Sequence, residues 1–208
     1  MKLLTISGSA RRDSVNTVLL LGLKDVAPEG VELSVFHRLD TLPVFSPDLE
    51  GPQTPAEVLE FLALVSGCDG IIIASPEYVR AIPGGLKNLI DWMVSRFEVI
   101  GKPIALAHAS HRGDDMLTSL RLVLSTVSDQ FLEHVFFAHP VDWKNARRNQ
   151  NPVEAARAAN RNARISVRVR GGDSCSADKC AWMSCRHECV LMAVFDHSPS
   201  ASRLRAAA

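Results

Sequence analysis

Two short segments carry polar side chains that could do chemistry, and the first, residues 7–17, has the composition of a phosphate-binding loop. Ser9 and Ser14 supply hydroxyls, Asn16 supplies an amide, and the guanidinium of Arg11 can donate two hydrogen bonds to one oxyanion. The segment joins an apolar run to an amphipathic stretch. It therefore leads into a helix N-terminus, where free N–H groups and the helix dipole attract anions. An ordinary turn with capping serines has the same composition, and this alternative stays open.

The second segment, residues 74–92, follows another apolar run. Pro76 and Pro83 stiffen its backbone, whose N–H and C=O groups could contact the edge of a planar heterocycle, and Tyr78 could stack on such a ring. The chain contains neither Gly-x-Gly-x-x-Gly nor Gly-Lys-Ser/Thr, which excludes a dinucleotide fingerprint and a Walker loop. Its apolar residues are expected to be ordinary helix core; they are Leu86, Leu89, Ile90 and Trp92.

The stretches that must position these segments alternate between strand and helix patterns. Residues 71–73 form a β-branched run of the kind found in strands buried on both faces of a parallel sheet. The alternation predicts an α/β fold with a doubly wound, five-stranded parallel sheet in the order 2-1-3-4-5. In that order both polar segments line the crevice between the first and third strands. Strands are expected at residues 2–7, 31–36, 68–75, 103–109 and 133–138, and helices at 14–27, 56–66, 84–96 and 114–130.

The two polar segments resemble the signatures of the NADPH-dependent FMN reductase family, flavodoxin-like flavoproteins that include quinone, chromate and azo-dye reductases. The resemblance covers about residues 1–140. Val79 is the one clear departure, because the family usually has asparagine there. The first motif is matched by Gly8, Ser9, Arg11, Ser14 and Asn16, and the second by Pro76, Glu77, Tyr78, Pro83, Gly84, Leu86, Lys87, Asn88, Asp91 and Trp92.

The resemblance implies a set of contacts to FMN. Ser110 would lie near the far edge of the isoalloxazine ring. The lost asparagine at position 79 removes a polar side chain, which could alter affinity or redox potential if that side chain contacts the flavin. The FMN phosphate would be held by Ser9, Arg11, Ser14, Val15 and Asn16, and the ring would be lined by Pro76, Glu77, Tyr78 and Val79.

The resemblance also implies an FMN-dependent NAD(P)H:acceptor oxidoreductase that reduces quinones, flavins, azo dyes or metal oxyanions. FMN would be the cofactor and NADPH or NADH the co-substrate. The flavin N5 would carry the chemistry, so no catalytic acid, base or nucleophile is expected from the protein. Its partner would be a small-molecule electron acceptor, which the sequence does not name. A flavodoxin-type FMN electron carrier and a non-catalytic remnant stay open as alternative classes.

Two further expectations concern subunit association and the rim of the predicted pocket. The family is commonly dimeric or tetrameric with its third helix near the interface, so we expect a homodimer or homotetramer with Trp92 and Met93 near the contact. His108 and His111 lie near the predicted pocket rim, where they could meet an anionic substrate. Such histidines are more often simply solvated, which is what we expect here.

The amino-acid composition limits the classes of binding partner and the cellular compartment that can be expected. The chain has 23 basic and 23 acidic residues, and this neutrality argues against nucleic acid or an anionic membrane as a partner. No stretch approaches the roughly 20 apolar residues of a membrane span, and the first apolar run is too short for a signal peptide. A cytoplasmic protein with reduced thiols is expected.

The charge is distributed unevenly along the chain. Residues 1–143 hold 11 basic and 18 acidic side chains, and residues 144–208 hold 12 and 5, which gives net charges of −7 and +7. We therefore expect a flavodoxin-like FMN-binding domain over residues 1–143 and an atypical basic, cysteine-rich tail over 144–208, either disordered or frame-shifted. No metal site is expected there, because zinc usually needs closely paired ligands. The evenly scattered thiols are Cys175, Cys180, Cys185 and Cys189.

Overall fold

The computed structural model describes part of the 208-residue chain. The predicted boundary at residue 143 and nearly all of the predicted tail lie outside the described residues, as do its four cysteines, so these remain predictions. The described residues are 1–11, 14–25, 27, 29–110, 112–138 and 166–167, with side chains described up to residue 132.

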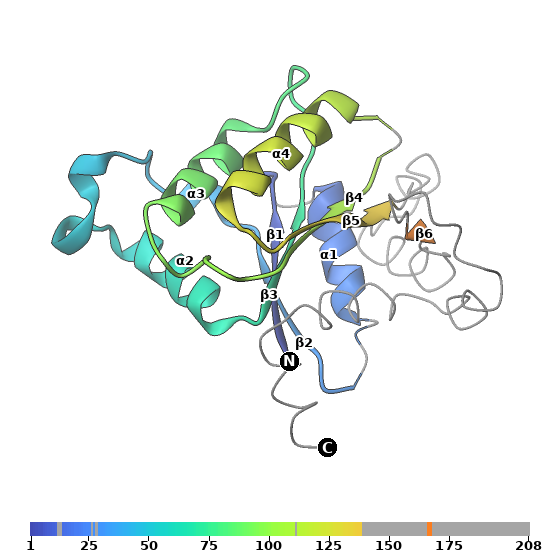
Figure 1. Cartoon of the computed structure of the whole chain (residues 1–208). Helices are drawn as coiled ribbons and strands as arrows, with labels where there is room; N and C mark the ends of the chain where they lie inside the picture. Colours follow the sequence, from blue (N-terminus) through green and yellow to red (C-terminus); the bar gives the residue numbers. More distant parts are fainter. Residues whose placement is uncertain (12–13, 26, 28, 111, 139–165, 168–208) are drawn as a thin grey trace.

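Strands and helices alternate along the described chain as the sequence predicts (Figure 1). The strands are β1 (Lys2–Ser7), β2 (Glu32–Phe36), β3 (Gly70–Ala74), β4 (Ile104–His108), β5 (Phe131–Ala138) and the two-residue β6 (Ser166–Val167). The helices are α1 (Val15–Asp25), α2 (Ala56–Gly67), α3 (Gly84–Val94) and α4 (Asp114–Val127), with three short 3₁₀ turns at Leu39–Thr41, Pro47–Leu49 and Gly51–Gln53.

The sheet confirms the predicted order. β2, β1, β3, β4 and β5 are parallel neighbours in that sequence, and β6 adds a short antiparallel pairing at the edge of β5. The chain order reverses between β1 and β3, where Ser7 at the end of β1 lies opposite Ala74 at the end of β3. The loops that follow these two strands therefore start side by side, at the switch point where α/β proteins bind ligands.

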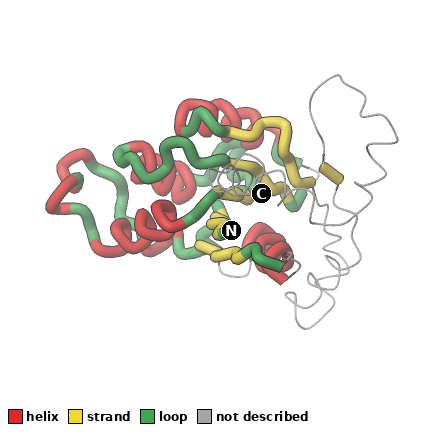
Figure 2. The backbone as a smooth tube through the Cα atoms, turned by 60° about the horizontal axis from the view of Figure 1, so that its bottom comes forward, coloured by secondary structure: helices red, strands yellow, loops and turns green. Residues whose placement is uncertain are grey.

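Helices cover both faces of the sheet (Figures 1 and 2). Side chains alternate along β3: Ile72 packs with α1 residues such as Leu20, whereas Ile71 and Ile73 pack with α2, α3 and α4 on the other face. All three isoleucines have no measurable exposure. This two-sided burial explains the continuous apolar run in the sequence and makes the centre of the sheet a rigid support for its carboxyl edge.

The α3 helix fixes the loop that follows β2. The Asn88 side chain accepts a hydrogen bond from Phe45 N at 2.7 Å and donates one to Pro43 O at 2.9 Å. Trp92 Nε1 donates to the same carbonyl oxygen at 2.9 Å, and its ring meets Phe45 edge-on at 5.0 Å. Asn88 and Trp92 of the family motif therefore act as scaffold residues.

The predicted core of α3 is confirmed, and it includes both residues that were expected near a subunit contact, so their side chains do not form a contact surface themselves. Trp92 and Met93 are each 1% exposed and lie inside the core with Leu86, Leu89 and Ile90. They cannot contact a second copy, because large apolar side chains on this helix face are already covered by the sheet and neighbouring helices. None of the helices in the described part of the chain has the length and apolar character needed to cross a membrane.

Candidate functional site

The loop after β1 is organised by a cluster of three buried hydroxyls. Thr17 Oγ1 lies 2.9 Å from Ser7 Oγ and 2.8 Å from Ser14 Oγ. Ser14 Oγ also accepts the backbone N–H of Thr17 at 3.0 Å, and α1 starts at Val15, so Ser14 is the N-cap of the helix. The capping alternative is therefore correct for Ser14. Sequence reasoning missed Ser7 and Thr17, because Thr17 occupies the position where a capping box has glutamate or glutamine.

A glycine lets this loop approach β3 closely. Gly8 N donates to Ala74 O at 2.7 Å. A Cβ atom built on Gly8 would lie 2.8 Å from Leu86 Cδ2 and 3.1 Å from both Ala74 O and Ser75 Cα. A side chain at this position would thus push the loop away from β3, so the first motif requires glycine here for a steric reason.

Ser9 joins the two predicted segments. Its side chain is buried, its Oγ lies 3.3 Å from the Tyr78 hydroxyl, and it accepts the backbone N–H of Arg11 at 3.2 Å. Asn16 is buried in the first turn of α1, and no hydrogen bond to its side chain is found within the described residues. The Arg11 side chain is exposed. This donor set, beside the free N–H groups of a helix N-terminus, fits a phosphate monoester.

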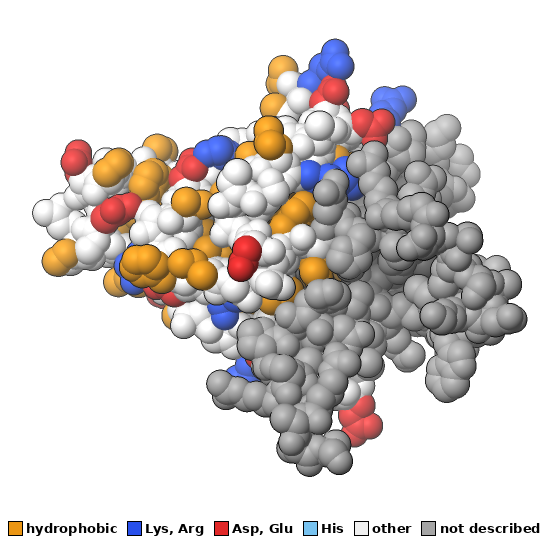
Figure 3. Space-filling model, in the orientation of Figure 1, with side chains coloured by type: hydrophobic (Ala, Val, Ile, Leu, Met, Phe, Trp, Pro, Cys, Tyr) orange, Lys and Arg blue, Asp and Glu red, His pale blue; other side chains and the backbone are white. Residues whose placement is uncertain are grey.

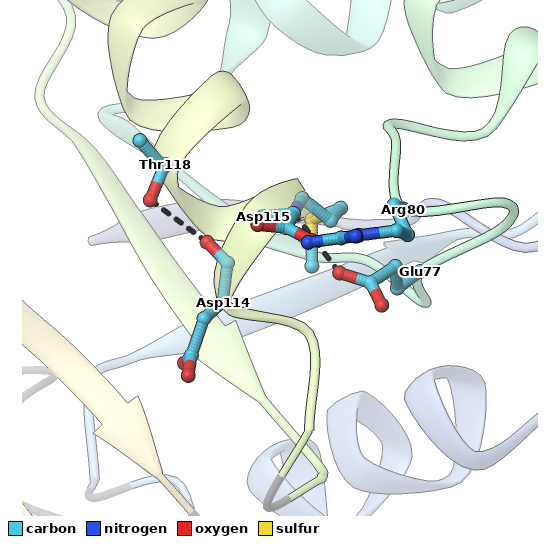
Figure 4. Close-up of polar contacts among 6 residues, drawn as sticks. Glu77, Arg80, Asp114, Asp115 and Thr118 are labelled. Atoms are coloured by element: carbon cyan, nitrogen blue, oxygen red, sulfur yellow. Dashed lines mark hydrogen bonds and ion pairs between the residues drawn. The ribbon is translucent and has the colours of Figure 1, made fainter.

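Glu77 and Arg80, in the loop after β3, both contact the first turn of α4 (Figure 4). The Glu77 carboxylate accepts a hydrogen bond from Met116 N at 3.1 Å, and Arg80 Nε pairs with Asp115. Pairing with Arg80 lowers the pKa of Asp115. The Glu77 side chain is therefore turned towards α4, and Pro76, half-buried, precedes it. Nothing in the sequence signals these contacts, which join residues more than 30 positions apart.

The tip of this loop is a two-residue turn with left-handed backbone. Tyr78 and Ala81 exchange backbone hydrogen bonds of 3.2 and 3.0 Å, and the residues between them, Val79 and Arg80, have φ of +52° and +60°. These are the features of a type I′ turn, in which asparagine is favoured. The Val79 side chain is 98% exposed. The asparagine usual in the family therefore suits the backbone conformation of this turn.

The loop after β4 carries Ser110, which is exposed and accepts the backbone N–H of Arg112 at 3.0 Å. His108 is 5% exposed, with Nε2 2.7 Å from Arg112 O, so the expectation that it is solvated is wrong. Burial lowers its pKa. Gly113 (φ +117°) caps α4, and a Cβ there would lie 3.1 Å from His108 Cε1. His111 lies outside the described residues.

The loops after β1, β3 and β4 thus meet at the carboxyl edge of a parallel sheet in the order 2-1-3-4-5, beside the switch point. This arrangement defines a flavodoxin-like α/β protein. The family described as NADPH-dependent FMN reductase matches residues 1–144, and the chain belongs to this family.

Individual relatives match over shorter stretches. A quinone reductase of Escherichia coli K12 is 32% identical over 114 residues, which cover 53% of this chain and 60% of that enzyme. A 2-hydroxy-1,4-benzoquinone reductase of Burkholderia is 36% identical over 92 residues, covering 44% and 49%. The chain thus spans about half of the length of these curated relatives. Among solved structures, the flavoenzyme NAD(P)H:(acceptor) oxidoreductase FerB of Paracoccus denitrificans superposes with a TM-score of 0.55 at 26% identity, covering 76% of this chain and 95% of FerB.

Proposed function

We propose that this chain is an FMN-dependent NAD(P)H:acceptor oxidoreductase that reduces a small molecule such as a quinone. The observation that carries the proposal is the contact between Ser9 Oγ and the Tyr78 hydroxyl, because it links the predicted phosphate-binding loop to the loop that carries Tyr78 at the switch point of the sheet. The family match over residues 1–144 and the relatives named as quinone reductases support the same activity.

The residues of the site would bind FMN through separate groups. Arg11, Asn16, Ser9 and the first N–H groups of α1 would hold the phosphate, and the hydroxyl cluster behind them would keep this helix end in place. Tyr78 and the backbone from Pro76 to Val79 would line the ring, with Ser110 near its far edge. Bound FMN would take a hydride from NAD(P)H and pass reducing equivalents to the acceptor.

His108 is an unsuitable proton donor in this proposal. It is buried, and that burial lowers its pKa, so the ring is neutral at physiological pH and its Nε2 is engaged with the Arg112 carbonyl group. Its role is to fix the turn that leads into α4. The chain's contribution to catalysis would then be placement of the flavin and exclusion of water.

The test is the visible spectrum of protein loaded with FMN, desalted, and then treated with NADPH without oxygen. We expect a retained flavin band that bleaches on addition of NADPH. A retained band that persists would support an electron carrier instead. Absence of the band would contradict FMN binding and favour a non-catalytic remnant.

A single substitution tests whether the loop after β1 binds the FMN phosphate. Ser9→Ala removes one hydrogen-bond partner and should weaken FMN binding about two- to tenfold. Ser125→Ala is the matched control, because Ser125 is exposed on α4 and bonds only to Leu122 O within the described chain. Equal FMN affinities of the two variants would argue against the assignment of this loop.

We further propose that the protein is cytoplasmic and forms a homodimer or homotetramer. Large apolar side chains are exposed in and after the end of α3: Val94 is 55%, Phe97 85% and Ile100 63% exposed. Hydrophobic groups are also visible on the surface in Figure 3. Exposed apolar groups of this size favour association. Phe97→Ser should therefore lower the molar mass found by light scattering, whereas an unchanged assembly would place the contact elsewhere.

A further inference from the structure

The Arg80 guanidinium is held at the tip of the ring-lining loop in a way that leaves most of its donors available. Its side chain is 82% exposed, and Asp115 contacts it through Nε (Figure 4). No described residue forms a hydrogen bond with its two terminal nitrogens. A guanidinium fixed through Nε presents its remaining N–H groups as a planar fork, which is the geometry that matches a phosphate group.

Three arginines lie at this edge of the sheet, beside the carboxylates of Glu77, Asp114 and Asp115. Arg11, Arg80 and Arg112 are exposed and lie in the loops after β1, β3 and β4, the three strands around the switch point. The nearby Glu77 carboxylate accepts a hydrogen bond from Met116 N, and its negative charge also acts on Arg80. The terminal N–H groups of Arg80 are therefore the donors that this loop can offer to an anionic ligand.

The stability of the fold does not explain the arginine. An ion pair as exposed as Arg80–Asp115, with side chains 82% and 48% exposed, contributes little to folding. The residue also has φ of +60°, a conformation that is unfavourable for a long side chain such as arginine and that glycine would adopt without strain. The Asp115 contact holds the loop through Nε, and the exposed terminal nitrogens are the part of Arg80 that this contact does not use.

We propose that Arg80, oriented by Asp115, binds a phosphate group of the nicotinamide dinucleotide. This inference rests on the proposed function. Arg11 follows the phosphate loop assigned to FMN, whereas Arg80 follows Tyr78 in the loop assigned to the ring. A second ligand that reaches the exposed ring face would thus meet Arg80. The phosphate is either the ribose 2′-phosphate, found only in NADPH and NADP⁺, or the pyrophosphate shared with NADH and NAD⁺.

Calorimetric titration with NADP⁺ and NAD⁺ tests the inference, because it measures binding without turnover. The protein is titrated both with and without FMN, so the result does not depend on flavin retention. Arg80→Gln should weaken NADP⁺ binding about tenfold, as expected for lost charge-assisted hydrogen bonds, and Arg80→Lys should give a smaller loss because it keeps only the charge. The matched control is Arg38→Gln, which removes another exposed, ion-paired arginine, 55% exposed and located after β2.

The pattern of losses identifies the phosphate. Weaker binding of NADP⁺ alone assigns Arg80 to the 2′-phosphate, and equal weakening of both nucleotides assigns it to the pyrophosphate. Affinities of Arg80→Gln equal to those of Arg38→Gln would overturn the inference, as would a wild-type protein that binds neither nucleotide. Failure to retain FMN is seen separately in the spectrum and bears on the proposed function alone.

Discussion

Replacing Val79 by asparagine should stabilise the protein. Val79 has φ of +52°, an unfavourable backbone conformation. Its side chain is 98% exposed, so no packing contacts offset this cost. A left-handed conformation costs an ordinary residue about 1–2 kcal/mol, and β-branched residues adopt it least readily. Asparagine tolerates it and is favoured in type I′ turns. We therefore expect Val79→Asn to raise the free energy of unfolding by about 1 kcal/mol.

That gain corresponds to a rise in Tm of about 2–4 °C for a domain of this size. It is measured by urea and thermal unfolding of the FMN-free protein. Val44→Asn is the control, because Val44 is 82% exposed and is not among the described non-glycine residues with positive φ. A Val79→Asn protein that is no more stable than Val44→Asn would refute the strain argument. A gain in FMN affinity without a gain in stability would instead favour a polar contact between position 79 and the flavin.

Three other predictions test particular contacts. Gly8→Ala should destabilise the fold by about 1–3 kcal/mol in urea unfolding, because its Cβ would lie 2.8 Å from Leu86 Cδ2. Gly84→Ala, with no atom within 4 Å of the added Cβ, is the control and should not be destabilised. Asn88→Ala should cost about 2–3 kcal/mol, because Phe45 N and Pro43 O each lose a hydrogen bond to the amide. The wild-type urea midpoint should fall as the pH drops below about 6.5, because burial lowers the pKa of His108 and the unfolded chain then binds more protons. His108→Gln should reduce that slope, and an unchanged slope would assign it to other groups.

The sheet was predictable because its information is local. The β-branched run Ile71–Ile73 is buried on both faces, and the alternation of strand and helix patterns restricts the sheet to few arrangements. The neighbouring positions of Ser9 and Tyr78 follow from that order alone, since parallel strands end at one edge. These parts of the candidate site could be derived before the structure was known.

The errors and omissions concern side chains whose surroundings are set by packing. Trp92 was predicted as helix core and is internal, whereas the burial of its neighbour Met93 is shown only by the packing of α3. His108 is the last residue of a strand whose residues are all buried. A single polar residue at a strand end does not indicate in the sequence whether its side chain is buried. The left-handed turn at Val79 could not be predicted, because a β-branched residue such as valine rarely adopts a positive φ.

The loop after β3 is held from two sides, and this determines how Tyr78 is presented. The Tyr78 hydroxyl meets Ser9 on the β1 side, while Glu77 and Arg80 contact Met116 and Asp115 at the start of α4. Each contact alone contributes little, but together they restrict the loop before any ligand arrives. A ring that binds to a fixed loop loses less ordering entropy than one that must first immobilise it. The contacts to α4 should therefore act on ligand affinity more than on the stability of the fold.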